Sequence, residues 1–465
     1  MLQKQHVLFA TYIVSQGLIH LLERSCYNPN MKKIALISHG CAKNLIDSEL
    51  MFGLLKKEGF EISLDDTNAD IVIVNTCSFI CDAERESVQT ILEMIEAGKK
   101  VIVTGCLAQK HSAELKDAIP ELSAVVGTTD FTELCEVLNS IINGEEFVSK
   151  VNANPDYIYP ENIERAQITM GASSYLKIAE GCNYRCGYCI IPFLRGAFHS
   201  RPMENIIAVA KQLVEKGVSE IILIAQDTSY YGIDLYKKPM LATLLRELNQ
   251  IPNLNWIRIM YTHPAMINDE LLEAIAECEK VVKYIDIPLQ HSHPDMLKRM
   301  NRPDFDYREM IAKMRAKIPN VAIRTSFVVG YPGETEEEFE HLYEFIKDVK
   351  FDRLGVFMYS REKGTSSYGM KPQISAKVKK ERHKKLMTLQ QGISLERNKS
   401  FVGKLVPCII EGFSDDGEVV ARTQYDAPEV DGVVSIKTYE AVVPGDIEMV
   451  KIISADEYDL VGELA

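Results

Sequence analysis

Three cysteines lie within eight residues of this chain, Cys182, Cys186 and Cys189, in a C-x-x-x-C-x-x-C pattern. Three thiolates on one loop can ligate three irons of a 4Fe-4S cluster and leave the fourth iron without a protein ligand. A structural zinc site normally recruits a fourth Cys or His nearby, and an electron-transfer ferredoxin closes its cluster with a fourth Cys. The next forty residues offer only His199, so the spacing favours a cluster with an open iron over a zinc site.

Three further cysteines, Cys41, Cys77 and Cys106, each follow a short apolar run, at 34–37, 71–74 and 101–103 respectively. Helical patterns around 44–58, 82–97 and 109–118 separate these runs, which predicts a doubly wound parallel sheet. The carboxyl ends of parallel strands line one edge of such a sheet, where ligands bind, so the three thiols should converge. We therefore predict a second cluster with three cysteine ligands.

Composition restricts the class of protein. The chain has 465 residues, 46% apolar and 25% charged, which suits two or three globular domains. Its net charge of -14 argues against a protein whose whole surface attracts nucleic acid. Eleven cysteines is an odd number, and their clustering suits metal ligation in a reducing compartment, so we expect a cytoplasmic protein. We interpret Cys81, Cys135, Cys278 and Cys408 as packing residues.

The central part of the chain repeats a strand-helix pattern. Six strand candidates share this pattern: 175–180, 220–225, 255–260, 283–288, 321–329 and 353–358. Each of the first five precedes a helical stretch, which predicts a partial (βα)6 barrel with catalytic groups at the carboxyl ends of its strands. A long charged helix, 375–398, then leads into short β-branched runs broken by glycines, which predicts a small all-β barrel.

These patterns divide the chain into five segments. Residues 31–146 form the N-terminal α/β sheet domain, 168–398 the central barrel and 399–465 the C-terminal barrel. The polar stretch 147–167 contains two prolines and is predicted to be a linker. Residues 1–30 contain an apolar run that is too short and too polar to span a bilayer and lacks an obvious cleavage site. We interpret them as a non-essential extension and expect no membrane partner.

The loop Cys182–Cys189, called the cluster loop below, resembles that of the radical S-adenosylmethionine (radical SAM) superfamily, including the aromatic Tyr188 before the last cysteine. The resemblance implies that the open iron binds the amino and carboxylate groups of SAM. It also implies that an electron from the cluster cleaves SAM to a 5′-deoxyadenosyl radical.

A second segment, residues 329–335 (VGYPGET), resembles a cofactor-contacting strand end of the same superfamily. The resemblance implies that Tyr188, Gly330 and Gly333 lie against the cofactor. A turn before the helix predicted at 335–349 explains the two glycines equally well, because glycine and proline mark turns generally.

Two such clusters followed by a small β domain resemble the methylthiotransferases, and the likeness covers residues 31–465. Members insert sulfur and a methyl group at an unactivated C-H bond; the MiaB type modifies an adenosine of transfer RNA and the RimO type an aspartate of ribosomal protein S-twelve. Three stretches are similar to the RimO type: GCAKNLIDSE (40–49), LKIAEGC (176–182) and DAPEVDG (426–432). The first has alanine at position 42, where proline is more usual.

Charge favours the same branch independently. The predicted C-terminal TRAM-like barrel, residues 401–465, holds fourteen acids against four bases, a net charge of -10. A barrel that gripped transfer RNA should carry Lys and Arg, because phosphate neutralisation dominates nucleic-acid affinity. We expect no direct nucleic-acid reading by this barrel and a basic ribosomal protein, or an assembling small subunit, as the partner. Solubility alone would also explain the acids.

Seven other polar residues match the family's motif or lie near predicted strand ends: Asp47, Glu49, Arg195, Arg201, His263, His291 and His293. Acids near a helix start also favour the helix dipole, which is our interpretation of the first two. The two arginines are candidates to counter cluster or substrate charge, although surface salt bridges explain them as often. For the three histidines we expect a packing or supporting role.

The resemblance therefore implies an enzyme with two 4Fe-4S clusters and SAM as cofactors and no catalytic residue beyond the cluster ligands. Hydrogen abstraction from the β-carbon of the target aspartate would be followed by transfer of a methylthio group carried by the second cluster, with flavodoxin or ferredoxin as the kind of one-electron donor. Two alternatives remain open, a transfer-RNA methylthiotransferase and a metal-binding scaffold on the ribosome.

Overall fold

The computed structural model describes residues 32–465 except positions 64, 79, 157, 158, 161, 162, 169, 170 and 439. The expectation for residues 1–30 lies outside the described residues. Across the described part of the chain, no helix has the length and apolar character needed to cross a membrane. The chain forms two compact units, one made mainly of residues up to Ala153 and the other mainly of Gln167–Ala465.

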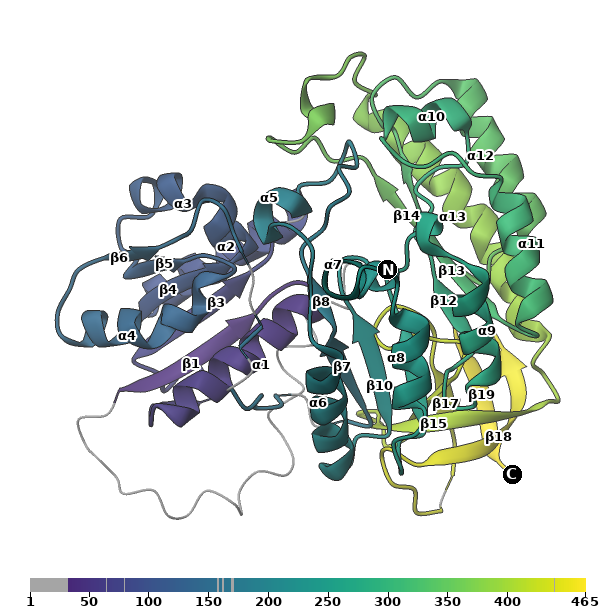
Figure 1. Ribbon diagram of the computed structural model, residues 1–465, viewed down its shortest axis with the longest axis horizontal. Coiled ribbons are helices and arrows are strands. Elements are labelled where there is room, and N and C mark those ends of the chain that lie inside the picture. Colours follow the sequence, from purple (N-terminus) through teal and green to yellow (C-terminus); the bar gives the residue numbers. More distant parts are fainter. Residues whose placement is uncertain are drawn as a thin grey trace. The chain divides into compact units, whose positions relative to one another are not determined.

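The first unit contains a six-stranded parallel sheet in the order β2-β1-β3-β4-β5-β6 (Figure 1). Its strands are β1 (Lys33–Ser38), β2 (Glu61–Ser63), β3 (Ile71–Thr76), β4 (Lys100–Gly105), β5 (Ala124–Val126) and β6 (Val148–Lys150). The central strands are apolar on both faces, and β3 is buried throughout, as expected of a parallel strand covered on both sides. The predicted doubly wound sheet is confirmed.

Helices connect these strands: α1 (Ala42–Lys57), α2 (Cys81–Glu96), α3 (Cys106–Ala118) and α4 (Leu134–Ile142). Ile91 of α2 and Leu107 of α3 share one apolar cluster with the valines of β3 and β4. The opposite face carries Ile34, Ile73 and Ile102, which are also fully buried. Side chains alternate between the faces of a strand, so each face needs its own layer of helices.

The segment expected to be a linker takes part in the first unit. Strand β6 lies inside 147–167 and pairs with β5. Further along, the Arg165 guanidinium forms a buried ion pair with Glu49, and the Ala166 N–H donates to the Glu49 carbonyl at 3.1 Å. A three-residue edge strand is too short to give a recognisable apolar pattern.

The second unit begins with six parallel strands that form a partial barrel (Figure 1): β7 (Ser173–Lys177), β10 (Glu220–Ile224), β11 (Trp256–Ile259), β12 (Tyr284–Asp286), β13 (Ala322–Val329) and β14 (Arg353–Met358). All six predicted strands are present. They form two three-stranded sheets, β7-β10-β11 and β12-β13-β14, which the bridge between Ile257 and Val281 joins. The sheet therefore curves but does not close.

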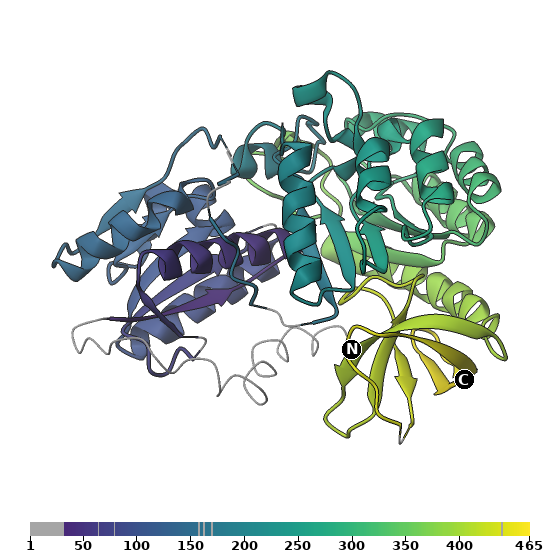
Figure 2. The ribbon, with the colours of Figure 1, turned by 60° about the horizontal axis from the view of Figure 1, so that its bottom comes forward.

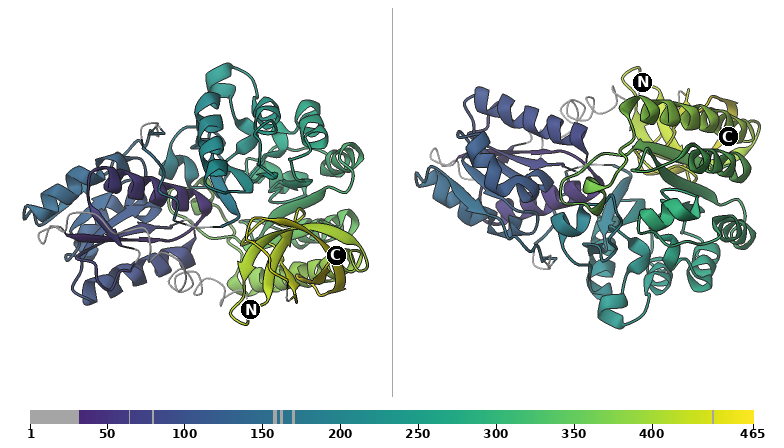
Figure 3. Two further views of the ribbon diagram at one scale, coloured as in Figure 1. Left: turned by 90° about the horizontal axis from the view of Figure 1, so that it is seen from below. Right: turned by 90° about the horizontal axis from the view of Figure 1, so that it is seen from above.

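Helices lie outside this curved wall of strands, teal to light green in Figure 3: α6 (Met203–Glu215), α8 (Leu241–Leu248), α9 (Asp269–Glu277), α10 (Pro294–Arg299), α11 (Tyr307–Lys317), α12 (Glu336–Val349) and α13 (Ala376–Lys399). Several begin at side chains that accept a hydrogen bond from the first turn. Thr335 and Glu338 form a reciprocal capping box at α12, and Asn268 caps α9. Capping therefore explains where these helices begin.

A closed five-stranded barrel ends the chain, yellow-green to yellow in Figure 2: β15 (Leu405–Phe413), β16 (Val419–Thr423), β17 (Val434–Ile436), β18 (Ile447–Ala455) and β19 (Leu460–Leu464). Alternate residues of these strands fill its interior, among them Cys408, Ile410 and Ile452. The predicted all-β barrel is confirmed.

Buried ion pairs attach this small barrel to the amino ends of the central strands. Arg422 of β16 pairs with Glu220 at the start of β10. In the segment 426–432, the Asp426 carboxylate lies 2.5 Å from Arg353, and Asp431 lies 3.4 Å from Arg324. The carboxyl ends of the central strands are left for the cluster loop.

Candidate iron-sulfur sites

The cluster loop leaves the carboxyl end of β7. A short antiparallel pair, β8 (Ala179–Glu180) and β9 (His199–Ser200), brackets the loop and the helix α5 (Ile191–Arg195) that follows it. The Cys182 N–H donates to the Gly196 carbonyl at 3.1 Å, and the Cys189 N–H donates to the Cys186 carbonyl at 3.0 Å. The three cysteines are therefore held on one folded loop at the strand ends.

Two glycines let the cluster loop pack closely. Gly181 has φ of +79°, and a Cβ there would lie 1.8 Å from the Ala197 carbonyl oxygen. At Gly187 a Cβ would lie 2.3 Å from the Tyr331 hydroxyl, and its N–H donates to the Met300 carbonyl at 2.7 Å. Neither position has room for a side chain, so glycine is needed at both. These two close contacts hold the loop on both sides of Cys186.

The thiols of this loop are largely withdrawn from solvent. Burial raises the pKa of the Cys182 thiol to about 11. Burial, followed by the neighbouring Cys186, raises the pKa of Cys189 to about 12. Iron binds thiolates rather than thiols, so cluster assembly here must release protons.

A buried ionic group lies directly before the loop. Glu180 accepts from the Lys177 ammonium at 2.5 Å and lies 3.6 Å from the Arg195 guanidinium, and the Glu180 and Lys177 side chains are fully buried. Although burial alone would raise the pKa of Glu180, Lys177 and then Arg195 lower it to about 2. Arg195 and Arg201 are both only 2% exposed, so their interpretation as surface salt bridges is wrong. Arg201 instead donates to the Lys177 carbonyl at 2.5 Å.

Several buried polar atoms around the loop lack a hydrogen-bond partner within the described residues. They are Gln226 Oε1, Asp227 Oδ2, His263 Nε2 and Arg302 Nε. Asp227 Oδ1 accepts from Ser229 N at 2.9 Å, and burial raises the pKa of Asp227 to about 6. His263 stacks on Tyr184 of the loop with ring centroids 3.8 Å apart. Buried polar groups in folded proteins are normally satisfied, so these atoms fit a polar cofactor such as SAM.

The three residues predicted to contact the cofactor have structural contacts of their own. Tyr188 packs against the apolar cluster that contains Tyr331 and Tyr359. The Gly330 N–H donates to the Glu334 carboxylate at 2.6 Å, and a Cβ at Gly330 would lie 2.3 Å from Lys379 Cγ. Gly333, with φ of +78°, belongs to the same turn before α12. The turn interpretation therefore accounts for both glycines, and their contact with a cofactor stays a prediction.

In the first unit, the second set of cysteines lies at the aligned ends of neighbouring strands. Register pairs Ser38 with Asn75, and Thr76 with Gly105. Cys77 and Cys106 therefore leave adjacent strands side by side, while Cys41 directly precedes α1. A Cβ at Gly40 would lie 2.8 Å from the Cys77 Cβ, so the first two loops touch. This placement fits three ligands around one cluster.

A buried amide network holds these loops in place. Asn44 Nδ2 donates to the His39 and Thr76 carbonyls at 2.9 Å each, and Asn75 Nδ2 donates to the Asn44 carbonyl at 2.9 Å. The Ser87 hydroxyl accepts from the Cys77 N–H at 3.0 Å. The chain on both sides of Cys77 is therefore fixed before any metal binds.

Asp47 and Glu49 are buried residues of α1 and lie beyond its first turn, which contains no acid. The helix-dipole interpretation of these two residues is therefore wrong, since the effect falls off within the first turn. Glu49 forms its ion pair with Arg165, as described above.

Two of the three histidines near the strand ends support the segment before α10. His291 lies 3.3 Å from the Glu334 carboxylate, and His293 caps α10. Among the described residues, His293, Asp295 and Glu338 form the one group of His, Cys, Asp or Glu side chains whose ligand atoms all lie within 4.8 Å of one another. The Glu338 carboxylate is already bound to Arg299 at 2.5 Å and to the Thr335 N–H at 2.8 Å. This group therefore has a structural explanation.

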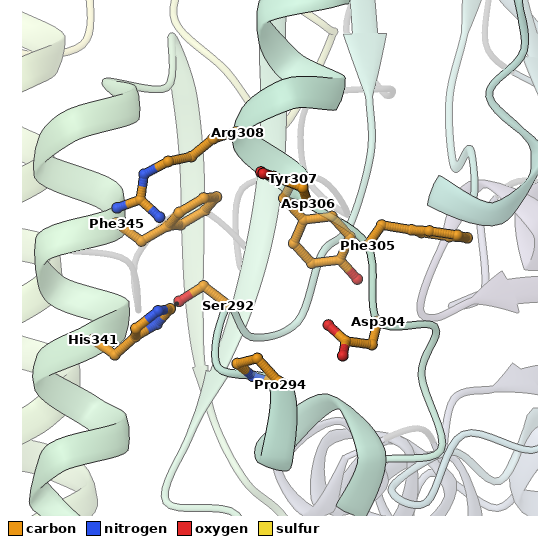
Figure 4. A pocket seen from close by; sticks show the side chains of 9 residues that line it. All are labelled: Ser292, Pro294, Asp304, Phe305, Asp306, Tyr307, Arg308, His341 and Phe345. Atoms are coloured by element: carbon orange, nitrogen blue, oxygen red, sulfur yellow. Dashed lines mark hydrogen bonds between the residues drawn. The ribbon is translucent and has the colours of Figure 1, made fainter.

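A surface cavity of about 390 Å³ lies between α10, α11 and α12. Figure 4 shows its lining side chains: Ser292, Pro294, Asp304, Phe305, Asp306, Tyr307, Arg308, His341 and Phe345. It contains no cysteine, so it is separate from the cluster loop. The same chain segment, however, continues back to Arg302, which contacts Cys186.

The sequence interpretation missed Asp227 and Arg302. Asp227 follows β10 at a strand end, where the barrel pattern predicts functional groups, so its position was a usable signal. Arg302 follows a short helix, and nothing local distinguishes it from other arginines.

Comparison with known families agrees with this geometry. The model of the radical SAM superfamily matches residues 176–346, and the TRAM domain model matches 402–465. A third model, described as uncharacterized protein family UPF0004, matches 33–127, the region that carries Cys41, Cys77 and Cys106.

Curated relatives match nearly the whole chain. The ribosomal protein uS12 methylthiotransferase RimO of Thermoanaerobacter sp. (strain X514) is 50% identical over 93% of this chain and 100% of its own. The protein of the same name from Lachnoclostridium phytofermentans is 47% identical over 92% of this chain and 99% of its own.

Solved structures share the fold at low identity. The radical SAM methyltransferase TsrM from Kitasatospora setae, with cobalamin and a [4Fe-4S] cluster bound, has a TM-score of 0.53 at 14% identity, over 73% of this chain and 77% of that chain. The cobalamin-dependent radical SAM enzyme OxsB, with aqua-cobalamin and S-adenosylmethionine bound, has a TM-score of 0.51 at 13% identity, over 78% and 56%.

Proposed function

Because this chain belongs to the family of ribosomal protein uS12 methylthiotransferases, we propose that it transfers a methylthio group to the β-carbon of an aspartate in that ribosomal protein. The observation that carries the proposal is the three-cysteine loop at the carboxyl ends of the barrel strands, beside buried polar atoms that have no hydrogen-bond partner among the described residues. The second set of cysteines, in the first unit, supports a methylthiotransferase over other radical SAM enzymes.

Two ligand sets follow from this proposal. Cys182, Cys186 and Cys189 hold the cluster that binds SAM, and the cysteines after β1, β3 and β4 hold the second 4Fe-4S cluster. When bound, these groups supply a radical that removes hydrogen from an unactivated carbon and a methylthio group that replaces it. The chain's own residues position them: Gly181 allows the loop its path, and the stacked His263 and the buried Asp227 offer hydrogen-bonding atoms to SAM.

The C-terminal barrel is proposed to face a basic protein. Its exposed acids are Asp415, Asp416, Glu429, Glu440, Asp446, Asp456, Asp459 and Glu463, against three exposed lysines. Leu405 and Met449, on the paired strands β15 and β18, are 56% and 46% exposed and add apolar surface. An acidic surface of this kind attracts a basic ribosomal protein and repels transfer RNA. Substrate and a one-electron donor such as flavodoxin or ferredoxin would both be met in the cytoplasm.

Mass spectrometry of a strain lacking the gene tests the substrate. Ribosomal protein uS12 should lose the mass of one methylthio group, while the transfer-RNA nucleosides remain unchanged. Complementation with the wild-type gene should restore the modification, and complementation with either triple-cysteine variant should not. Loss of a methylthio group from nucleosides alone would exclude the proposal and favour the transfer-RNA enzyme.

Iron analysis tests the two ligand sets. Anaerobically reconstituted protein should hold about eight irons, and alanine replacement of either cysteine triplet should leave about four. A Cys135→Ala variant is the matched control, because that thiol lies outside both sets, and it should keep about eight. A second cluster is disproved if the variant of Cys41, Cys77 and Cys106 keeps all its iron.

A further inference from the structure

Arg302 is a buried arginine beside the cluster loop. Its residue is 8% exposed, its Nη1 donates to Cys186 Sγ at 3.9 Å, and its Nη2 donates to the Pro288 carbonyl at 2.6 Å. Its Nε is buried and has no hydrogen-bond partner within the described residues. The guanidinium is therefore buried and contacts Cys186, a proposed cluster ligand, rather than solvent.

Arg302 differs from three other buried arginines of this unit, each of which pairs with a carboxylate. Arg258 and Arg422 pair with Glu220, and Arg382 pairs with Glu334. No ion pair joins Arg302 to an acid in the part of the chain that the structure describes. The charge of Arg302 acts on the buried carboxyl of Asp227, but no ion pair joins them. A buried cation without a paired counter-charge is costly, so this site favours a further anion.

We propose that Arg302 balances the negative charge of the cluster held by Cys182, Cys186 and Cys189 and thereby raises its reduction potential. The inference rests on the proposed function for the existence of that cluster. On reduction, one electron passes from an external reductant into the cluster and no bond to the protein changes. The thiolate-ligated cluster becomes more negative, so a nearby fixed cation stabilises the reduced form more than the oxidised form.

A redox titration followed by electron paramagnetic resonance measures this effect. The protein is the full chain with Cys41, Cys77 and Cys106 replaced by alanine, so that one cluster is observed, and titanium(III) citrate is the reductant. Arg302→Gln should lower the equilibrium constant for one-electron reduction at least about tenfold, which is about 59 mV. Arg302→Lys keeps the positive charge and should change this equilibrium constant less than about threefold.

Two further variants serve as controls for the measured reduction potential. Arg308→Gln removes an exposed cation six residues further on, paired with Asp348 at 3.0 Å, and should leave the potential unchanged. Asp227→Asn removes a buried acid that acts on Cys182 and should shift the potential in the opposite direction to Arg302→Gln. An unchanged potential in Arg302→Gln overturns the proposal.

The thermal stability of the cluster-free protein gives a second, independent readout. If Arg302 serves the cluster, the apo form of Arg302→Gln should melt at the same temperature as the wild-type apo form or higher, because an unbalanced buried charge has been removed. A melting temperature several degrees lower would show that Arg302 is an anchor for the loop and would refute charge balance even if the variant assembled no cluster. Neither measurement involves methylthio transfer, so a wrong substrate assignment would leave both results intact.

Discussion

Glu220 provides a quantitative test of how the C-terminal barrel is attached. Its carboxylate is fully buried at the start of β10 and accepts from Arg258 Nε at 2.8 Å and from the Ser173 hydroxyl at 2.7 Å. It also pairs with Arg422, which belongs to the barrel. The isosteric change Glu220→Gln keeps the volume and removes the charge, which leaves Arg422 paired with Glu411 alone and takes the carboxylate partner from Arg258.

The pKa of Glu220 sets the expected magnitude. Burial alone would raise it, but Arg422 and Arg258 lower it from 4.5 to about 2. At about 1.36 kcal/mol per pKa unit, this lowering corresponds to about 3 kcal/mol of folding free energy. Because the folded-state pKa is depressed, that stability is present above pH 4.5 and is lost as the pH falls from 4.5 toward 2. Breaking a buried pair costs about 3–5 kcal/mol, which agrees.

Thermal unfolding should therefore show a melting temperature about 6 °C lower for Glu220→Gln at pH 7. The difference from wild type should stay constant from about pH 8 to 5 and narrow only below pH 4.5. Glu277→Gln is the control, since that exposed carboxylate pairs with Arg246 at 2.8 Å and should contribute less than about 1 kcal/mol. An equal fall in melting temperature in the two variants would refute this reasoning. So would a difference between Glu220→Gln and wild type that varies with pH near neutrality.

Two further outcomes concern the cluster loop. Gly181→Ala should halve the iron content to about four, because its Cβ cannot occupy a place 1.8 Å from the Ala197 oxygen; full iron occupancy would contradict the packing argument. In the apo-protein, alkylation of Cys182 and Cys189 by iodoacetamide should accelerate about tenfold per pH unit from about pH 7 to 9, because only the thiolate reacts and burial raises the two pKa values to about 11 and about 12. Mass spectrometry would measure these rates, and pH-independent rates would show that the thiols are already ionised.

Long, strongly patterned elements of this fold were predictable from the sequence. All six strands of the partial barrel and the three central strands of the first sheet coincide with apolar runs, because a buried parallel strand must be apolar on both faces. The short strands β2, β5 and β6 were not predicted. Each has three residues, too few to show a period, and their pairing depends on the sheet beside them.

The candidate site divides in the same way. The spacing of Cys182, Cys186 and Cys189 is local, so the sequence alone indicates a shared cluster. Arg302 is more than a hundred residues away along the chain, and only the folded barrel brings it to Cys186. The interpretation of Arg195 and Arg201 as surface residues failed for a related reason, since burial of a charged side chain depends on partners that no local pattern reveals.

The segment 426–432 contributes both to the resemblance to the RimO type and to the negative charge of the C-terminal barrel. Its resemblance to the RimO type supports the family, yet its acids Asp426 and Asp431 bind Arg353 and Arg324 of the central barrel. Two of the three acids in that likeness therefore serve to attach the small barrel. Only the acids that remain exposed, such as Asp415 and those of the β18 to β19 turn, are available to attract a substrate. Eight exposed acids against three exposed lysines still give the barrel an acidic surface, so fewer residues are available to attract a basic protein than the net charge of -10 suggests.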